Sequence, residues 1–335
     1  MKLSILDQAP ISVGQTPQEA LEDAKKLAQV GEQLGYERYW IAEHHDLPGL
    51  ACSAPEVMLG YLGAATTSIR LGSGAVLLPH YKPYKVAEMY NMLATLFPGR
   101  IDVGIGRAPG GSAEATEALS DQFLQQVWKM PELIRDLLHF LHQGFTKDHR
   151  FSNVSAAPVP SIAPKAWLLG TSQKSAVLAA KNGLAYAFGQ FMSDKDGKEI
   201  IRTYRNEFQP SQNAQEPSVI LTVSVICAET IKKAHEVASS SLLWKLQLAK
   251  GEGKQGVPSI EQAINHSYTE EEKMELTKMK RNMIIGNPNE VYAKLRQLQN
   301  DYNADEIMLV TITHEIEDKL TSYRLIKQEE SCPTK

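Results

Sequence analysis

The sequence predicts a parallel (β/α)8 barrel, the TIM barrel. Short apolar runs alternate with amphipathic segments along nearly the whole chain, and eight of these runs can be assigned as strands. The runs are continuously apolar, which is typical of parallel strands that are covered on both faces. A doubly wound sheet is the main alternative, although such sheets usually contain fewer strands.

The expected strands cover residues 3–8, 38–43, 69–78, 100–106, 166–170, 185–189, 218–228 and 305–310. The expected helices cover residues 17–34, 54–66, 83–97, 115–142, 172–182, 194–208, a segment from 230, 287–299 and 315–328. The first helix has clear end signals, because Thr16 is suited to the N-cap, Pro17 to the first helical position and Gly35 to the end.

One long segment interrupts this alternation after the seventh strand. Residues 248–282 are charged and carry glycines at 251, 253 and 256. We expect an insertion here, which is either a lid over the active site or a disordered surface segment. The whole chain, residues 1–335, is expected to form a single barrel domain that carries this insertion.

Composition excludes several classes of function. The net charge is −4 and there is no tract dense in lysine or arginine, so a nucleic-acid partner is not expected. The longest apolar stretch, residues 218–228, is too short to span a membrane. Three widely spaced cysteines, Cys52, Cys227 and Cys332, indicate no disulfide framework and fit a cytoplasmic protein. The expected partner is a small molecule or another protein.

The strand assignment also predicts where the site lies, because barrel enzymes place it at the carboxyl ends of the strands. Strand two is followed by Glu43, His44 and His45. Neighbouring residues of an extended segment point to opposite sides, so the two histidines cannot readily hold one metal ion, and no metal site is expected. One histidine should face the cavity while the other packs locally.

A phosphate group is the ligand that two other strand ends favour. The segment "GIGRAPGG" (104–111) does not spell GxGxxG and fits a glycine-rich turn as well as a nucleotide loop, but Arg107 directly after a strand is suited to an anion. In "GTSQKSA" (170–176), three hydroxyl residues lie at a helix N-terminus, where they either form a plain N-cap or hold a phosphate. Together these two segments indicate a phosphate monoester.

Five segments, taken in order, resemble the bacterial luciferase-like flavin monooxygenases. They are "YWIAEHH" (39–45), "GSGAVLLPHYKP" (72–83), "LFPGRIDVGIGRAPG" (96–110), "LLGTSQKSAVLAAKNGLAYAFG" (168–189) and the tail "GNPNEVYAKLRQL…ADEIMLV". The resemblance implies a (β/α)8 barrel that works with reduced FMN. Light-emitting relatives have a cysteine where this chain has Gly106, so a luciferase is not expected.

The resemblance also implies roles for individual residues. Arg107, Ser172 and Ser175 would hold the 5′-phosphate, with Thr171 beside them. Gly74 and Ala75 would lie against the isoalloxazine, where the family has a non-prolyl cis peptide, and Ser73 and Gly170 belong to the same cofactor set. His44 would stabilise a flavin C4a-peroxide and move a proton, with Glu43 and His45 as supports.

The activity implied is oxygenation of an unidentified small organic substrate with O2. Because no NAD(P)H-binding module is recognisable, a separate NAD(P)H:flavin reductase is expected to supply FMNH2. Relatives are commonly dimers through helices near the second and third strands, so a homodimer is expected. Two alternatives stay open: an F420-dependent oxidoreductase of the same superfamily, and a non-catalytic flavin-binding protein.

Overall fold

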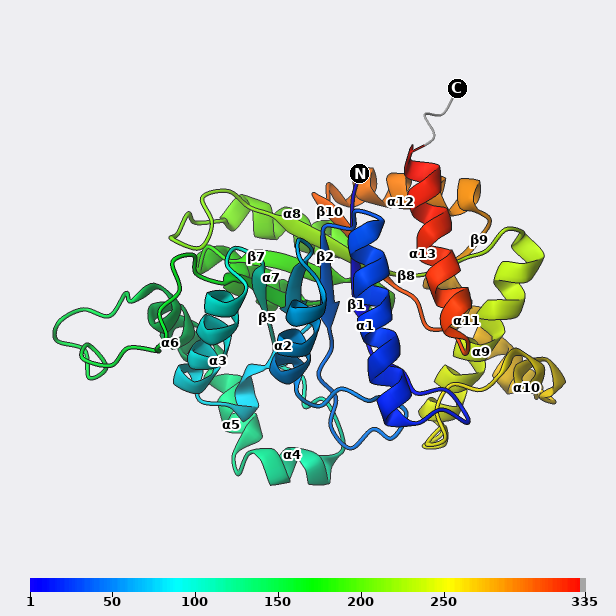
Figure 1. Ribbon diagram of the computed structural model, residues 1–335, viewed down its shortest axis with the longest axis horizontal. Coiled ribbons are helices and arrows are strands. Elements are labelled where there is room, and N and C mark those ends of the chain that lie inside the picture. The colour runs from blue at the N-terminus through cyan, green and yellow to red at the C-terminus, as the bar shows by residue number, and fades with distance from the viewer. Residues whose placement is uncertain (332–335) are drawn as a thin grey trace.

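The predicted strands close into a parallel barrel in a computed structural model, which describes residues 1–331 (Figure 1). Each strand pairs in parallel with its neighbours, and the last one pairs with both the first and the seventh, which completes the ring. The predicted fold class is therefore confirmed. The barrel strands are β1 (Lys2–Asp7), β2 (Arg38–Ile41), β3 (Arg70–Ser73) continued by β4 (Val76–Leu77), β5 (Ile101–Gly106), β6 (Lys165–Gly170), β7 (Ala185–Gly189), β8 (Val219–Cys227) and β10 (Glu306–Val310).

Helices surround the strands, and Figure 1 shows α1 and α13 side by side. Their ends follow the predicted signals: Thr16 and Glu19 form a capping box at the start of α1, with Pro17 in its first turn. The helices are α1 (Pro17–Gln33), α2 (Pro55–Ala65), α3 (Pro83–Leu96), α4 (Ala113–Leu119), α5 (Phe123–Trp128), α6 (Met130–His142), α7 (Gln173–Lys181), α8 (Gly197–Glu207), α9 (Ile231–Ala249), α10 (Ile260–Asn265), α11 (Glu270–Arg281), α12 (Pro288–Tyr302) and α13 (Ile316–Ser331), with short 3-10 turns η1 (Leu78–His80) and η2 (Gln190–Met192).

The structure differs from the prediction at several places, and the helices α10 and α11 within 248–282 are among them. The segment 115–142 is divided among three helices, and Pro131, which cannot donate a backbone hydrogen bond, sits in the first turn of the last of them, α6. The third predicted strand is divided into β3 and β4, which both pair with β5. An additional strand, β9 (Met283–Gly286), was not predicted. It pairs with the carboxyl half of β8, outside the ring.

A buried charge network fills the amino-terminal end of the barrel. The Arg38 guanidinium lies 2.6 Å from a carboxylate oxygen of Asp102 and 2.7 Å from one of Glu306. The indole N–H of Trp40 donates to Asp102 as well. All four side chains are buried, so every charge here has a partner that offsets its desolvation. This end of the barrel is a structural closure, which leaves the opposite end for a ligand.

Residues 248–282 include the helices α10 and α11 and contact the carboxyl end of the barrel. Val257 donates its N–H to Ile11 O (2.8 Å), and its carbonyl accepts from Val13 N–H (2.9 Å) and lies 2.9 Å from Nδ1 of His314. The insertion therefore contacts the loops that follow β1 and β10. Whether it acts as a lid stays a prediction. Within residues 1–331, no helix combines the length and the apolar character that crossing a bilayer requires.

Candidate active site

The carboxyl ends of seven barrel strands surround a pocket of about 370 Å³. This volume lies in the range of small-molecule sites. The strand ends converge as the sequence predicts, with β1 contributing Leu6 and Gln8, and β8 contributing Thr222. The other lining residues are Ala42, Glu43, His44, Gly74, Ala75, Leu77, Gly106, Arg107, Ala108, Gly110, Leu169, Gly170, Thr171, Ser172, Ser175, Ala187, Gly189, Phe191 and Met192.

The two adjacent histidines diverge. Trp40 packs inside the barrel, and the alternation of an extended segment carries Ala42 and His44 to the same side, so both line the pocket. His45 is not among the lining residues. Its Nε2 lies 2.8 Å from a carboxylate oxygen of Glu43, and its ring meets His80 edge to face. Among residues 1–331, no three His, Cys, Asp or Glu side chains lie close enough together to hold a metal ion.

His44 has a ring nitrogen without a partner in residues 1–331, and a shifted pKa. Its Nδ1 is buried, with no hydrogen-bond partner among the described residues. Burial, and then the neighbouring charge of His45, lowers the pKa of His44 from 6.5 to about 4. The imidazole is therefore neutral near pH 7. A neutral ring has one N–H donor and one acceptor nitrogen, which a group that passes a proton needs.

Glu43 is a buried acceptor for three donors from different segments. Its oxygens accept from the Leu77 N–H (3.0 Å), from the Tyr81 hydroxyl (2.6 Å) and from the His45 ring. Burial, and then the hydrogen bond to the Glu43 carboxylate, raises the pKa of Tyr81, so this hydroxyl keeps its proton and donates. Glu43 therefore fastens β4 and the turn η1 to the segment that carries His44.

The cis peptide that the resemblance implies lies between β3 and β4. A non-prolyl cis peptide joins Gly74 and Ala75, and both residues line the pocket. Ser73 does not line it: its hydroxyl donates to Gly104 O (3.0 Å) and accepts from Gly104 N–H, so it links β3 to β5. The cofactor contact assigned to Ser73 stays a prediction. A Cβ at position 106 would lie 2.9 Å from that of Ala75, so Gly106 leaves no room for a cysteine side chain without a shift.

The glycines of "GIGRAPGG" serve close backbone packing. A Cβ on Gly104 would lie 2.1 Å from Ser73 O, and one on Gly111 would lie 1.9 Å from His45 O. The loop therefore presses against the segments after β2 and β3. This geometry fits the alternative that treats the motif as a turn, and it places Arg107 at the rim of the pocket.

The predicted phosphate residues gather at the start of α7. Ser172 and Ser175 cap the helix reciprocally, each hydroxyl accepting from the other residue's N–H. Thr171 lines the pocket beside them, and Gly170 is required because a Cβ there would lie 2.3 Å from the Ser175 hydroxyl. The capping box leaves the N–H groups of Gln173 and Lys174 uncommitted at the positive end of the helix dipole.

Arg107 faces this helix end as an exposed side chain. It makes no hydrogen bond or ion pair with any residue of the described chain. Its positive charge reaches Tyr186, whose hydroxyl lies 3.0 Å from that of Ser175, although burial dominates and raises the pKa of Tyr186 to about 12. An unpaired guanidinium opposite a helix N-terminus fits a phosphate well.

Sequence reasoning missed several residues of the site. Tyr81 and Tyr186 support Glu43 and Ser175 from behind, and Phe191 and Met192 line the pocket after β7. The rule that sites form at strand ends could have identified Phe191 and Met192, since the turn η2 directly follows β7. The two tyrosines give no such signal, because their contacts come from distant segments.

Comparison with known proteins identifies this barrel. The sequence profile of the family described as "Luciferase-like monooxygenase" matches residues 1–303. The chain belongs to this luciferase-like monooxygenase family. Among curated members, it is 43% identical to the Bacillus subtilis protein YwcH over 98% of each chain. It is 37% identical to the N-acetyl-S-alkylcysteine monooxygenase of Bacillus subtilis over 97% of each chain.

Several solved structures share the fold. Apo-MsnO8 superimposes with a TM-score of 0.86 at 32% identity, covering 100% of this chain and 99% of the other. Two more distant structures share the fold at 17% and 13% identity, with TM-scores of 0.71 and 0.67. One is the oxygenating constituent of 3,6-diketocamphane monooxygenase from Pseudomonas putida in complex with FMN, and the other is an F420-dependent secondary alcohol dehydrogenase. This barrel fold is thus shared with one protein solved in complex with FMN and with one F420-dependent enzyme.

Proposed function

We propose that this protein is the oxygenase of a two-component, FMN-dependent monooxygenase. The observation that carries the proposal is the unpaired Arg107 beside the N-terminus of α7, at the rim of the pocket that His44 lines. If the phosphate bound there, the pocket backbone at Gly74 and Ala75 would be available to support the flavin ring. Membership of a monooxygenase family supports the same activity.

The chain's own residues would divide the work as follows. Arg107, Thr171, Ser172 and Ser175 bind the phosphate, and the backbone at Gly74–Ala75 supports the ring. When bound in its reduced form, FMN supplies the electrons that activate O2. Apolar side chains such as Leu6 and Leu77 exclude water from the pocket. His44 is neutral, so it can donate from one ring nitrogen and accept a proton at the other, while Glu43 and His45 hold its segment in place.

The other partners belong to this proposal too. A separate NAD(P)H:flavin reductase would supply FMNH2, and the organic substrate would enter with O2. N-acetyl-S-alkylcysteines, named for the Bacillus subtilis relative, are the first compounds to try. A homodimer is supported by exposed apolar side chains on two neighbouring helices: Val57 on α2, and Met92 and Leu96 on α3. We also propose that residues 1–335 form one domain in which residues 248–282 act as a lid.

Binding measurements test the cofactor. FMN, riboflavin and F420 are titrated into the wild type and into Arg107→Ala. We expect Arg107→Ala to weaken FMN binding by about 10- to 100-fold, which corresponds to losing a charge-assisted hydrogen bond, and to leave riboflavin binding unchanged. Equal FMN affinities for the two proteins would refute the phosphate assignment. Tighter binding of F420 than of FMN would favour the F420-dependent alternative.

Oxygen consumption tests the reaction. With FMNH2 and a panel of sulfur compounds, wild-type protein should couple O2 uptake to product, and His44→Ala should lower the rate of product formation by about 10²- to 10⁴-fold while FMN still binds. Unchanged coupling in His44→Ala would overturn the role of His44. FMN binding without substrate-dependent O2 uptake would favour a non-catalytic flavin-binding protein.

A further inference from the structure

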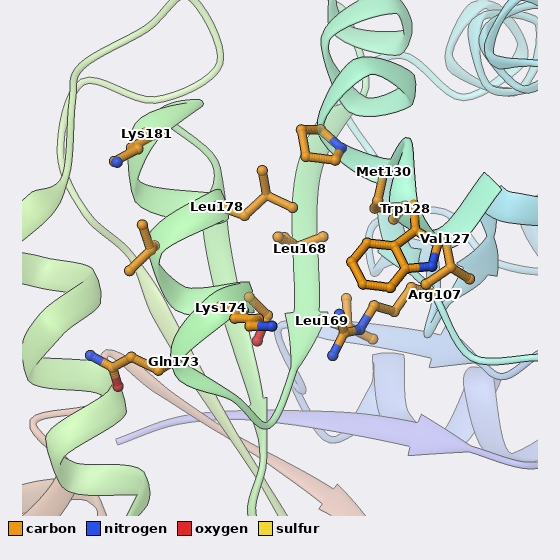
Figure 2. Close-up of a pocket in the computed structure, with 13 residues that line it drawn as sticks. Arg107, Val127, Trp128, Met130, Leu168, Leu169, Gln173, Lys174, Leu178 and Lys181 are labelled. Carbon is orange, nitrogen blue, oxygen red and sulfur yellow. The ribbon is translucent and has the colours of Figure 1, made fainter. Parts of the chain in front are cut away.

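A second cavity adjoins the phosphate residues on the outer side of the barrel. This lateral groove, of about 700 Å³, lies between α7 and the junction of α5 with α6, and the strand β6 forms its floor (Figure 2). Arg107, Leu169 and Ser175 line both the lateral groove and the barrel pocket. The two cavities therefore meet at the place where the flavin phosphate would lie.

The walls of the lateral groove combine apolar surface with positive charge. Figure 2 shows the Trp128 indole beside Arg107 on one side, and the α7 side chains of Lys174, Leu178 and Lys181 on the other. Lys174, Leu178 and Lys181 fall on one face of α7 because they are spaced by three and four residues. Of the described lining residues, three are cationic and none is acidic, although the whole chain has a net charge of −4. An anion with a large aromatic part complements this surface.

Trp128 is far more exposed to solvent than the other three tryptophans. Its side chain is 83% exposed, whereas Trp40, Trp167 and Trp244 are at most 2% exposed. An exposed indole beside cations is the combination on which nucleic acid bases stack while their phosphates are neutralised. The polyglutamate-bearing tail of an F420-type cofactor offers no aromatic group for such a wall.

We propose that the lateral groove binds the adenylate half of FAD. This inference rests on the proposed flavin function and extends it, because the first phosphate would occupy the same residues that hold the FMN phosphate. The second phosphate would lie near Arg107 and Lys174, and the adenine would stack on Trp128. The site then accepts flavins that are extended beyond the 5′-phosphate.

Affinity ratios test the subsite. Dissociation constants for FMN and FAD are measured by titration calorimetry on the wild type, on Trp128→Ala and on Leu124→Ala. Leu124 is the matched control, since it is an exposed apolar residue of α5 that does not line the groove. In Trp128→Ala the preference for FAD over FMN should fall by about tenfold, the effect of losing about 1.4 kcal/mol of base stacking. Leu124→Ala should keep the wild-type ratio.

Charge and accessibility give independent readouts. Lys174→Gln should weaken FAD binding more than FMN binding, whereas Lys129→Gln, at an exposed position outside the groove, should affect neither. Because Trp128 is the exposed tryptophan, acrylamide quenching of tryptophan fluorescence reports on the groove. FAD should protect this fluorescence and FMN should not.

The outcomes separate the two proposals. A fall of less than about fivefold in the FAD-to-FMN preference of Trp128→Ala, below the stacking energy of one base, overturns the adenylate subsite. If FMN still binds in that case, the proposed function survives, and the groove becomes a surface for another partner such as the reductase. If neither flavin binds the wild type, the proposed function fails and the subsite fails with it.

Discussion

Nε2 of His45 donates a hydrogen bond of 2.8 Å to Oε1 of Glu43, and this contact holds the His45 ring away from the pocket that His44 lines. Two adjacent histidines therefore have separate tasks. His45, the Tyr81 hydroxyl and the backbone N–H of Leu77 all bond to the buried Glu43 carboxylate. His44 is the imidazole that is available to a ligand.

The hydrogen bonds to Glu43 predict that replacing this residue by glutamine, which has the same shape, lowers the stability of the protein. In Glu43→Gln, one terminal atom becomes an NH2 group, so at least one of the three donors loses its acceptor. We expect the free energy of unfolding to fall by about 1–3 kcal/mol, measured by urea unfolding. Glu114→Gln, at an exposed position on α4, is the control and should be neutral. Wild-type stability in Glu43→Gln would mean that the network contributes nothing.

The lowered pKa of His44 predicts a pH dependence of stability. The unfolded chain binds the His44 proton near pH 6.5, but the folded protein resists protonation until about pH 4. Stability is therefore complete above pH 6.5 and falls as the pH drops toward 4, by up to about 1.4 kcal/mol per pH unit from this one group. His44→Gln should lack this component. Parallel stability curves for the two proteins between pH 7 and pH 4.5 would contradict the prediction.

Two helices begin with the same kind of cap, so replacing each cap in turn distinguishes an effect on stability from an effect on FMN binding. Ser172 begins α7 and Ser259 begins α10, each with a reciprocal capping box. Replacing either serine by alanine should cost about 1 kcal/mol or less in thermal or urea unfolding. Only Ser172→Ala should also weaken FMN binding, because only that cap lies beside Arg107. Equal FMN affinities for Ser172→Ala and Ser259→Ala would exclude the Ser172 hydroxyl from the phosphate site.

The proposed homodimer predicts that a new surface charge weakens association when it is placed on α3 but not when it is placed on α11. Met92 on α3 and Met274 on α11 are both more than half exposed. Met92→Asp introduces a charge into the apolar surface shared by α2 and α3, and it should shift the protein toward monomer in sedimentation equilibrium. Met274→Asp should leave the association unchanged. If both variants sediment like the wild type, the interface lies elsewhere.

The fold was predictable because buried parallel strands leave a strong signal in sequence. Runs such as residues 218–228 are apolar over their whole length, and Thr16 and Pro17 mark a helix start by local chemistry alone. The divergence of His44 and His45 followed from the alternation of an extended segment in the same way. These features depend on neighbours along the chain, which sequence displays directly.

The parts that escaped prediction depend on contacts between distant segments. Nothing near Glu43 in sequence reveals that Tyr81 and Leu77 will donate to it. The four residues of β9 follow a charged helix and are too few to stand out as a strand. The lateral groove arises from the spacing between α7 and the α5–α6 junction, so Trp128 could not be recognised as one of its walls.

The way in which the barrel closes has a consequence for synthesis of the chain. The strand β10 pairs with both β1 and β8, and it also delivers Glu306 to the buried Arg38. Until that strand leaves the ribosome, β1 and the amino half of β8 present unpaired edges, and Arg38 lacks its buried partner Glu306. Unpaired edges invite association between chains. We therefore expect a chain that ends before Glu306 to associate with other chains instead of closing its barrel.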